Sequence, residues 1–164
     1  MKLSPCVVVV DDDQDDVFFL RRGFRRAGLS IHLLDLSDGV QATGYFRGIS
    51  PYDDRLRFPL PDLVLLDLKM PKMNGFEVLA WLCGRPDMKD MPVVVLTSSP
   101  LEEDRKMAAR LGARDFLTKP NDCSDWVKLA EYLHNRWLAA NHQPEPTWTK
   151  FSGLEKDPGI CGGP

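Results

Sequence analysis

Short apolar runs alternate with amphipathic segments along the chain, and each run has the length of a strand. The runs over residues 6–10 and 63–66 are uninterrupted, and the first is rich in β-branched residues. Continuous runs of this kind are typical of strands buried on both faces of a parallel sheet. We therefore expect five strands, at residues 6–10, 31–36, 63–66, 92–96 and 115–118.

Between these runs, apolar residues recur at the spacing of a helix. Val17, Leu20 and Phe24 share one face of the first such segment, and Gly28 suits its C-terminal stop. The strict alternation predicts an α/β fold, a doubly wound five-stranded parallel sheet with helices on both faces. Right-handed crossovers leave few arrangements, of which we expect the flavodoxin-like strand order 2-1-3-4-5. Helices are expected over residues 15–28, 38–46, 76–83, 101–111 and 122–140.

The composition fits one globular domain followed by a tail. The chain has 164 residues, of which 43% are hydrophobic and 27% charged, so a single core is expected. We assign this domain to residues 1–140. Residues 141–164 are rich in proline, glycine and polar side chains, which predicts a tail that is flexible or docked on a partner.

The charge balance and the cysteines narrow the class of protein. The net charge of -3 argues against sequence-independent binding of nucleic acid. No apolar run approaches the roughly 18 residues that span a bilayer. The aspartates after Val10 interrupt the apolar start too early for an export signal. We expect a cytoplasmic protein without membrane contact, and the four cysteines, which lack C-x-x-C spacing, to be free thiols.

Polar residues follow the predicted strands at the places where ligands bind. In a doubly wound sheet, ligands bind at the carboxyl ends of the strands, beside the point where the strand order reverses. With the order 2-1-3-4-5 this point lies between the first and third strands, so their terminal carboxylates converge. The polar residues at the strand ends are Asp11, Asp12, Asp67, Thr97 and Lys119.

Converging carboxylates repel each other and need a positive counter-charge. Two charges about 4 Å apart interact by up to about 4 kcal/mol at an effective dielectric constant of about 20. Mg²⁺ offsets such repulsion with one or two carboxylates, a backbone carbonyl and several waters as ligands. Lys119 would add a positive charge, and Thr97 a hydroxyl donor. Together these groups suit a phosphoryl group, whose oxygens need charge neutralisation.

Each of these residues alone has a simpler explanation. An aspartate cluster after a strand is often a solvated strand end with a helix cap, and Asp13 or Asp15 would be the cap here. Asp67 could cap a turn, Thr97 could cap a helix, and Lys119 could lie in a plain loop. The order Asp-Asp, Asp, Thr and Lys at four strand ends favours a joint site over four separate explanations.

The strand ends carry four motifs: Val-Val-Asp11-Asp12, Leu-Leu-Asp67-Leu-Lys-Met-Pro, Val-Leu-Thr97-Ser and Phe-Leu-Thr-Lys119-Pro. Together these motifs resemble the receiver domain of bacterial two-component response regulators. The resemblance extends over about residues 5–140. It implies phosphoryl transfer from a histidine kinase to a single aspartate, and a signalling switch that catalyses only its own phosphotransfer and dephosphorylation rather than an enzyme.

The resemblance implies which residues accept the phosphoryl group and bind the metal. Asp67 would be the acceptor. Asp12 and Asp67 would bind Mg²⁺, or Mn²⁺ in its place, directly. Asp11 would bind the metal through water, and Lys69 through its backbone carbonyl.

The resemblance also implies how the phosphoryl group is held and sensed. Thr97 and Lys119 would bind its oxygens. Phe116 would be the aromatic switch residue, although a buried aromatic side chain beneath the fourth helix is equally compatible with its position. The Lys119–Pro120 peptide would be cis, which X–Pro bonds tolerate.

Looser features narrow the resemblance to stand-alone receivers that partner bacterial phytochromes. These features are the long loop over residues 50–61 and the Asp15-Asp16-Val17 step. The partner would then be a sensor histidine kinase, with a bacteriophytochrome as the candidate.

The end of the domain suggests how the signal leaves it. No second domain follows residue 140, so we expect output through protein–protein contacts and no DNA partner. Homodimerisation is the first expectation, because the last helix and the tail carry Trp137 and Trp148.

Two other classes of protein remain open. Phosphatases of the haloacid dehalogenase type also use an aspartate, Mg²⁺, a hydroxyl and a lysine, but their nucleophile opens a D-x-D motif after the first strand. Asp11-Asp12-Asp13 passes for that motif, yet Asp67 would then have no role and a cap domain is not evident. A flavodoxin-like FMN binder would need glycine, serine or threonine in the first loop, where this chain has acids.

Overall fold

The sheet has the expected topology. The computed structural model describes residues 4–139, and within them five parallel strands lie in the order β2-β1-β3-β4-β5. The predicted α/β fold is therefore confirmed, and the strand ends agree with the expected ones to within one residue. The strands are β1 (Cys6–Val10), β2 (His32–Leu36), β3 (Leu63–Leu66), β4 (Val93–Thr97) and β5 (Asp115–Thr118).

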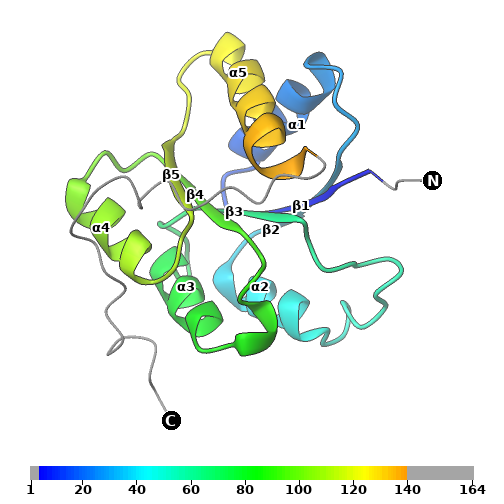
Figure 1. The fold of residues 1–164 in the computed structure, drawn as a ribbon, viewed down its shortest axis with the longest axis vertical. Coiled ribbons are helices and arrows are strands. Elements are labelled where there is room, and N and C mark those ends of the chain that lie inside the picture. Colours follow the sequence, from blue (N-terminus) through cyan, green and yellow to red (C-terminus); the bar gives the residue numbers. More distant parts are fainter. Residues whose placement is uncertain (1–3, 140–164) are drawn as a thin grey trace.

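Helices cover both faces of the sheet. In Figure 1, α1 and α5 lie on one side of the strands, and α2, α3 and α4 lie on the other. The helices are α1 (Gln14–Arg26), α2 (Gly39–Arg47), α3 (Gly75–Cys83), α4 (Glu102–Arg110) and α5 (Cys123–Leu133). A short 3₁₀ turn, Pro86–Met88, precedes β4.

The last predicted helix, over residues 122–140, is shorter than expected. Helix α5 ends at Leu133, and a π-helical segment, His134–Leu138, follows it. Trp137 and Leu138 are both buried in this segment. The predicted tail, residues 141–164, lies outside the described residues.

The central strands explain why the apolar runs are continuous. Val8 and Val10 pack on the side of α2 and α3, whereas Val7 and Val9 pack on the side of α1 and α5. Every residue of β1, β3 and β4 is buried. Because helices cover both faces, each side chain of these strands lies in one of two cores, and polar residues begin where the strands end.

Polar caps fix the starts of the helices beside the strand ends. Asp13, one of the two predicted caps, accepts hydrogen bonds from the backbone N–H groups of Asp15 and Asp16 at the start of α1. Asn74 caps α3 in a reciprocal capping box with Glu77. These caps hold the loops after β1 and β3 in defined positions.

The long loop between α2 and β3 packs against the end of α2. Arg55 donates hydrogen bonds to the backbone carbonyls of Tyr45 at 2.9 Å, Phe46 at 2.8 Å and Phe58 at 3.2 Å. Tyr45 and Phe46 lie in the last turn of α2, where carbonyls lack the usual i+4 N–H partner, so the guanidinium group supplies donors to that turn. Phe58 also packs edge-on against the ring of Tyr45.

The free-thiol expectation holds at two of the described cysteines and is wrong at a third. Cys6 and Cys123 are free thiols, whereas Cys83, at the end of α3, is disulfide-bonded. Spacing along the chain gives no sign of pairing between distant positions, and Cys83 is half-buried rather than enclosed in the core.

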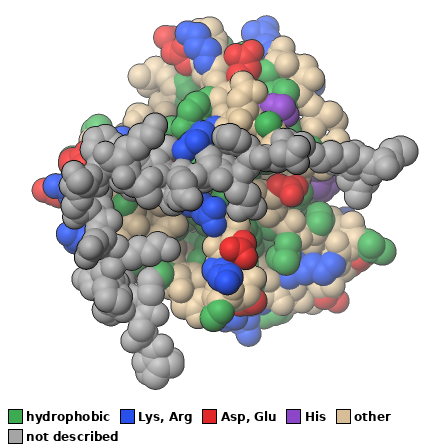
Figure 2. Space-filling view, viewed as in Figure 1, with side chains coloured by type: hydrophobic (Ala, Val, Ile, Leu, Met, Phe, Trp, Pro, Cys, Tyr) green, Lys and Arg blue, Asp and Glu red, His purple; other side chains and the backbone are tan. Residues whose placement is uncertain are grey.

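The surface agrees with the modest net charge. Basic and acidic side chains are interspersed on the face seen in Figure 2. None of the helices within residues 4–139 combines the length and the apolar character that crossing a bilayer requires.

Candidate functional site

The ends of β1 and β3 bring the predicted carboxylates together. The backbone N–H of Asp67 donates to the carbonyl of Val10 at 2.9 Å, which fixes the two strand ends side by side. Carboxylate oxygens of Asp11, Asp12 and Asp67 all lie within 4.8 Å of one another. Asp11 and Asp67 are buried, whereas Asp12 is exposed. The convergence predicted from the strand order is therefore present.

Lys119, at the end of β5, supplies the positive charge that the carboxylates need. Its Nζ lies 2.8 Å from Oδ2 of Asp11 and 3.3 Å from Oδ2 of Asp67. A third partner is Asp16 in the first turn of α1, whose Oδ2 lies 2.7 Å from the same nitrogen. Only 9% of the Lys119 side chain is exposed, so these contacts are poorly screened by water.

Burial and pairing act in opposite directions on the charges of this site. Burial raises the pKa of Asp11 to about 6, although hydrogen bonds from Lys119 and from the Asp13 backbone favour its charged form. Burial alone would lower the pKa of Lys119. Its hydrogen bonds to Asp11 and Asp16 outweigh this effect and raise the pKa above its ordinary value. Lys119 is therefore an ammonium ion at any physiological pH.

The raised pKa of Asp11 predicts how stability depends on pH. Folding keeps a proton on Asp11 between its ordinary pKa of 3.8 and a pKa of about 6. The stability that protonated Asp11 contributes is complete below the lower value and is lost as the pH rises through the upper one. Relative to Asp11→Asn, the free energy of unfolding of the wild type should fall by roughly 3 kcal/mol between pH 4 and 7.

This pH dependence can be measured by urea unfolding of both proteins in EDTA, which removes divalent cations. A difference in unfolding free energy that stays constant from pH 4 to 7 would contradict the assignment.

The donor set fits a hard divalent cation. Three carboxylates supply oxygen ligands, and the exposed side chain of Asp12 leaves one side open to water. Asp11, Asp12 and Asp67 are thus the residues that could hold Mg²⁺ or Mn²⁺. Lys69 lies in the loop after Asp67 with its side chain exposed, and the role of its backbone carbonyl stays a prediction.

Thr97 lies at the same end of the sheet. It is fully buried as the last residue of β4, and its carbonyl accepts a hydrogen bond from the Lys119 backbone N–H at 2.9 Å. The Thr97 Oγ1 accepts a hydrogen bond from the Ser99 N–H at 3.3 Å. The Ser99 hydroxyl in turn donates to Asp104 of α4, which joins the end of β4 to that helix.

Phe116 is buried on β5 beneath α4. It belongs to the same core as Ala108 and Leu111, and the guanidinium carbon of Arg105 lies 4.9 Å from the centre of its ring. This position agrees with a core residue and with a switch residue, so the switch role stays a prediction.

The predicted cis peptide is not found. The cis peptide bond among the described residues is Ser50–Pro51, and the Lys119–Pro120 bond is trans. A trans X–Pro bond is favoured by about 0.5–1 kcal/mol unless a turn holds the other isomer, so trans is the default state here.

Two contributions to the site were missed at the level of the sequence. Asp16 was noted only as part of a three-residue step. Gly75 stands so close to β3 that a Cβ there would overlap the Asp67 carbonyl oxygen. The Asn-Gly pair at the start of α3 was a usable signal for this close approach.

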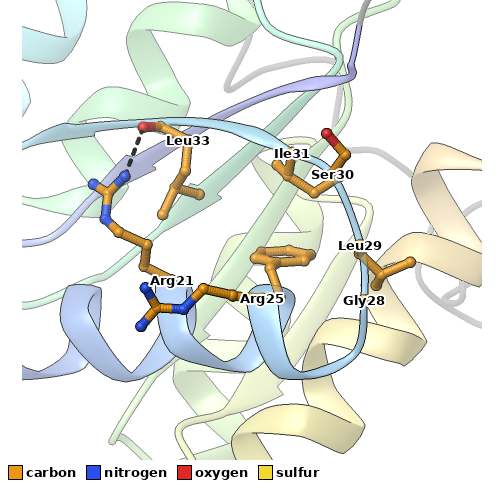
Figure 3. Close-up of a pocket in the computed structure, with 8 residues that line it drawn as sticks. Arg21, Arg25, Gly28, Leu29, Ser30, Ile31 and Leu33 are labelled. Atoms are coloured by element: carbon orange, nitrogen blue, oxygen red, sulfur yellow. Dashed lines mark hydrogen bonds between the residues drawn. The ribbon is translucent and has the colours of Figure 1, made fainter.

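A groove elsewhere on the molecule is separate from this site. It measures about 380 Å³ and lies at the C-terminal end of α1, where Arg21 and Arg25 project along one side (Figure 3). The Arg21 guanidinium group already has two partners: it donates a hydrogen bond to the Leu33 carbonyl at 3.2 Å and forms an ion pair with Asp35 at 3.1 Å. The carboxylates of the site follow β1 and β3, at the opposite end of α1.

A doubly wound sheet with clustered carboxylates and a buried lysine at its switch point defines a flavodoxin-like domain with an acidic site that could hold a cation. The sequence assigns the family: residues 7–131 match the response regulator receiver domain, and the chain belongs to this family. The receiver fold and the general identification made from the motifs are thereby confirmed.

Particular relatives narrow the likeness to phytochrome response regulators. The chain is 33% identical to response regulator Rcp1 of Synechocystis sp. (strain ATCC 27184 / PCC 6803 / Kazusa) over 132 residues, which cover 80% of this chain and 88% of the relative. The Mn²⁺-bound structure of Rcp1 has a TM-score of 0.75 at 31% identity, covering 85% of this chain and 99% of that one.

Two further solved structures agree with this likeness. The phosphorylated cyanobacterial phytochrome response regulator RcpA has a TM-score of 0.78 at 28% identity. The match covers 87% of this chain and 100% of the RcpA chain. Response regulator RPA3017, in red light signaling of R. palustris, has a TM-score of 0.79 at 31% identity. The match covers 85% of this chain and 98% of RPA3017.

Proposed function

We propose that this chain accepts a phosphoryl group on Asp67 from a sensor histidine kinase, in a reaction that depends on Mg²⁺. The observation that carries the proposal is the contact of one buried lysine with the buried carboxylates of Asp11 and Asp67 at the switch point. Membership of the receiver family supports the same reaction. The solved Mn²⁺-bound relative supports a divalent cation.

In this reaction an oxygen of Asp67 attacks the phosphorus of a phosphohistidine. An O–P bond forms, the N–P bond breaks, and its electron pair stays on the imidazole nitrogen, which takes up a proton. The Leu68 N–H, which donates to Oδ1 of Asp67 at 2.8 Å, orients the carboxylate. Lys119 neutralises the phosphoryl oxygens. A cation held by Asp11, Asp12 and Asp67 would add further neutralisation of this charge.

The acyl phosphate would then act as a conformational signal. It places a phosphoryl group of charge about -1.5 to -2 beside the end of β4, in place of the single negative charge of the carboxylate. We propose that Thr97 donates a hydrogen bond to one phosphoryl oxygen and that Phe116 changes its packing beneath α4. Water later hydrolyses the acyl phosphate, which returns the switch to its first state. The chain thus turns over no substrate apart from its own phosphoryl group.

The relatives suggest the partner. RcpA is a phytochrome response regulator by name, and RPA3017 belongs to red light signaling. We propose that the kinase is a bacteriophytochrome and that both proteins meet in the cytoplasm. Output would pass through protein contacts, including a homodimer, rather than through DNA. Exposed apolar side chains on and beside α4 and on α5 support such contacts: Leu101, Met107 and Tyr132.

Phosphotransfer from a radiolabelled bacteriophytochrome kinase tests both the acceptor and the partner. The label should move to the wild-type chain in Mg²⁺, and it should stay on the kinase when the acceptor is Asp67→Asn. If a histidine kinase without a phytochrome sensor transfers its label equally fast, the proposed partner is wrong while the acceptor stands.

A further inference from the structure

We propose that Asp16 is a positioning residue that holds the Lys119 ammonium group in the site when a cation is bound. The inference rests on the proposed phosphorylation of Asp67. It adds a residue that belongs to neither the acceptor nor the candidate metal ligands. Its basis is the set of three ion pairs that Lys119 makes.

The three carboxylates around Lys119 are not equivalent. A lysine ammonium group has three N–H donors, and three acceptors surround this one. Oδ2 of Asp16 is the nearest at 2.7 Å, followed by Asp11 at 2.8 Å and Asp67 at 3.3 Å. Asp16 is therefore as close a partner of the Lys119 ammonium group as Asp11 and Asp67 are, although it lies on a helix rather than at a strand end.

Two of the three carboxylates that pair with Lys119 could also bind a cation. Asp11 and Asp67 belong to the carboxylate cluster that could hold a cation, and Asp16 does not. A cation would draw electron density from both carboxylates and would repel the ammonium group. Asp16 is then the one partner that stays fully available to Lys119. Without Asp16, the ammonium group should move outward from the site toward water.

Asp15 provides a control that carries the same charge. It lies beside Asp16 in the first turn of α1, its side chain is exposed, and the structure records no ion pair between it and Lys119. Asp15→Asn and Asp16→Asn remove the same charge from the same helix end, so general effects on the helix dipole and on cation attraction should match. A difference between the two variants reports the contact with Lys119.

The first measurement follows the position of Lys119 itself. Wild type and variants are treated with a lysine-reactive N-hydroxysuccinimide ester with and without Mg²⁺, and labelling of Lys119 is read by peptide mass spectrometry. Mg²⁺ should raise this labelling severalfold in Asp16→Asn but not in wild type or Asp15→Asn. Asp16→Glu, which keeps the charge, should restore most of the protection.

The second measurement follows the reaction with acetyl phosphate at saturating Mg²⁺. Asp16→Asn should accept phosphoryl groups roughly tenfold more slowly than Asp15→Asn, because a displaced catalytic group loses alignment. Equal rates and equal labelling would overturn the role of Asp16, and so would a faster Asp16→Asn. If the wild type forms no adduct, the proposed function fails, and the inference that rests on it fails as well.

Discussion

Replacing Lys119 with methionine is expected to lower the free energy of unfolding by about 3–5 kcal/mol at neutral pH without divalent cations. The substitution keeps an unbranched side chain, one atom shorter than lysine, but removes its charge. Asp11 and Asp67, which are both buried, would then face each other without a counter-charge. Asp16 would lose the same partner.

Two features separate this effect from a simple loss of packing. The loss of unfolding free energy caused by Lys119→Met should be smaller below pH 6. Burial raises the pKa of Asp11 to about 6, so Asp11 is protonated there and one of the two repelling charges is absent. Added Mg²⁺ should restore part of the stability, since it replaces the missing positive charge.

Urea unfolding at pH 7.5 and 5, with EDTA or Mg²⁺, measures these effects. Lys128→Met is the control, because Lys128 pairs with Asp125 on the surface and its loss should leave stability nearly unchanged. A loss for Lys119→Met below about 1 kcal/mol, typical of exposed pairs, would show that the carboxylates are not repelling each other.

Gly75→Ala is the second change with a large expected effect. An added Cβ would overlap the carbonyl oxygen of Asp67 and lie 2.8 Å from Cα of Leu68. Both neighbours are backbone, so the end of β3 or the start of α3 must shift. We expect roughly 3 kcal/mol of destabilisation, at the upper end for an overpacked site, together with weaker binding of a cation by Asp67.

Gly44→Ala is the matched control for this prediction. Apart from its chain neighbours and the backbone of its own helix, no atom lies within 4 Å of the position of its added Cβ, and Gly44 lies within α2. Alanine there should raise the unfolding free energy by about 0.5–1 kcal/mol. Thermal unfolding of both variants measures the contrast. Equal effects would show that α3 does not press against the end of β3.

The arrangement of the strands was predictable because it follows from burial. Valine and leucine fill β1, β3 and β4 without interruption, since helices cover both faces of the sheet, and this pattern is readable along the chain. The first polar residue after each strand then lies at one edge of the sheet. Asp67 and Lys119 could be placed in one site for this reason alone.

Other features depend on geometry that spacing does not encode. The contact of Asp16 with Lys119 requires the packing of α1 over the sheet to turn that side chain inward. In the sequence, Asp16 looks like any acid in the first turn of a helix. The isomer of the Lys119–Pro120 bond rests on a difference of about 1 kcal/mol, which the local sequence does not determine.

The most direct test of the central claim is the intact mass of the protein after incubation with acetyl phosphate. Wild type, Asp67→Asn and Asp35→Asn are compared with and without Mg²⁺, the last as an exposed aspartate beyond the carboxylate cluster. The account predicts one Mg²⁺-dependent phosphoryl adduct on wild type and on Asp35→Asn, and none on Asp67→Asn. An adduct that survives in Asp67→Asn would move the nucleophile toward Asp11 and contradict the account.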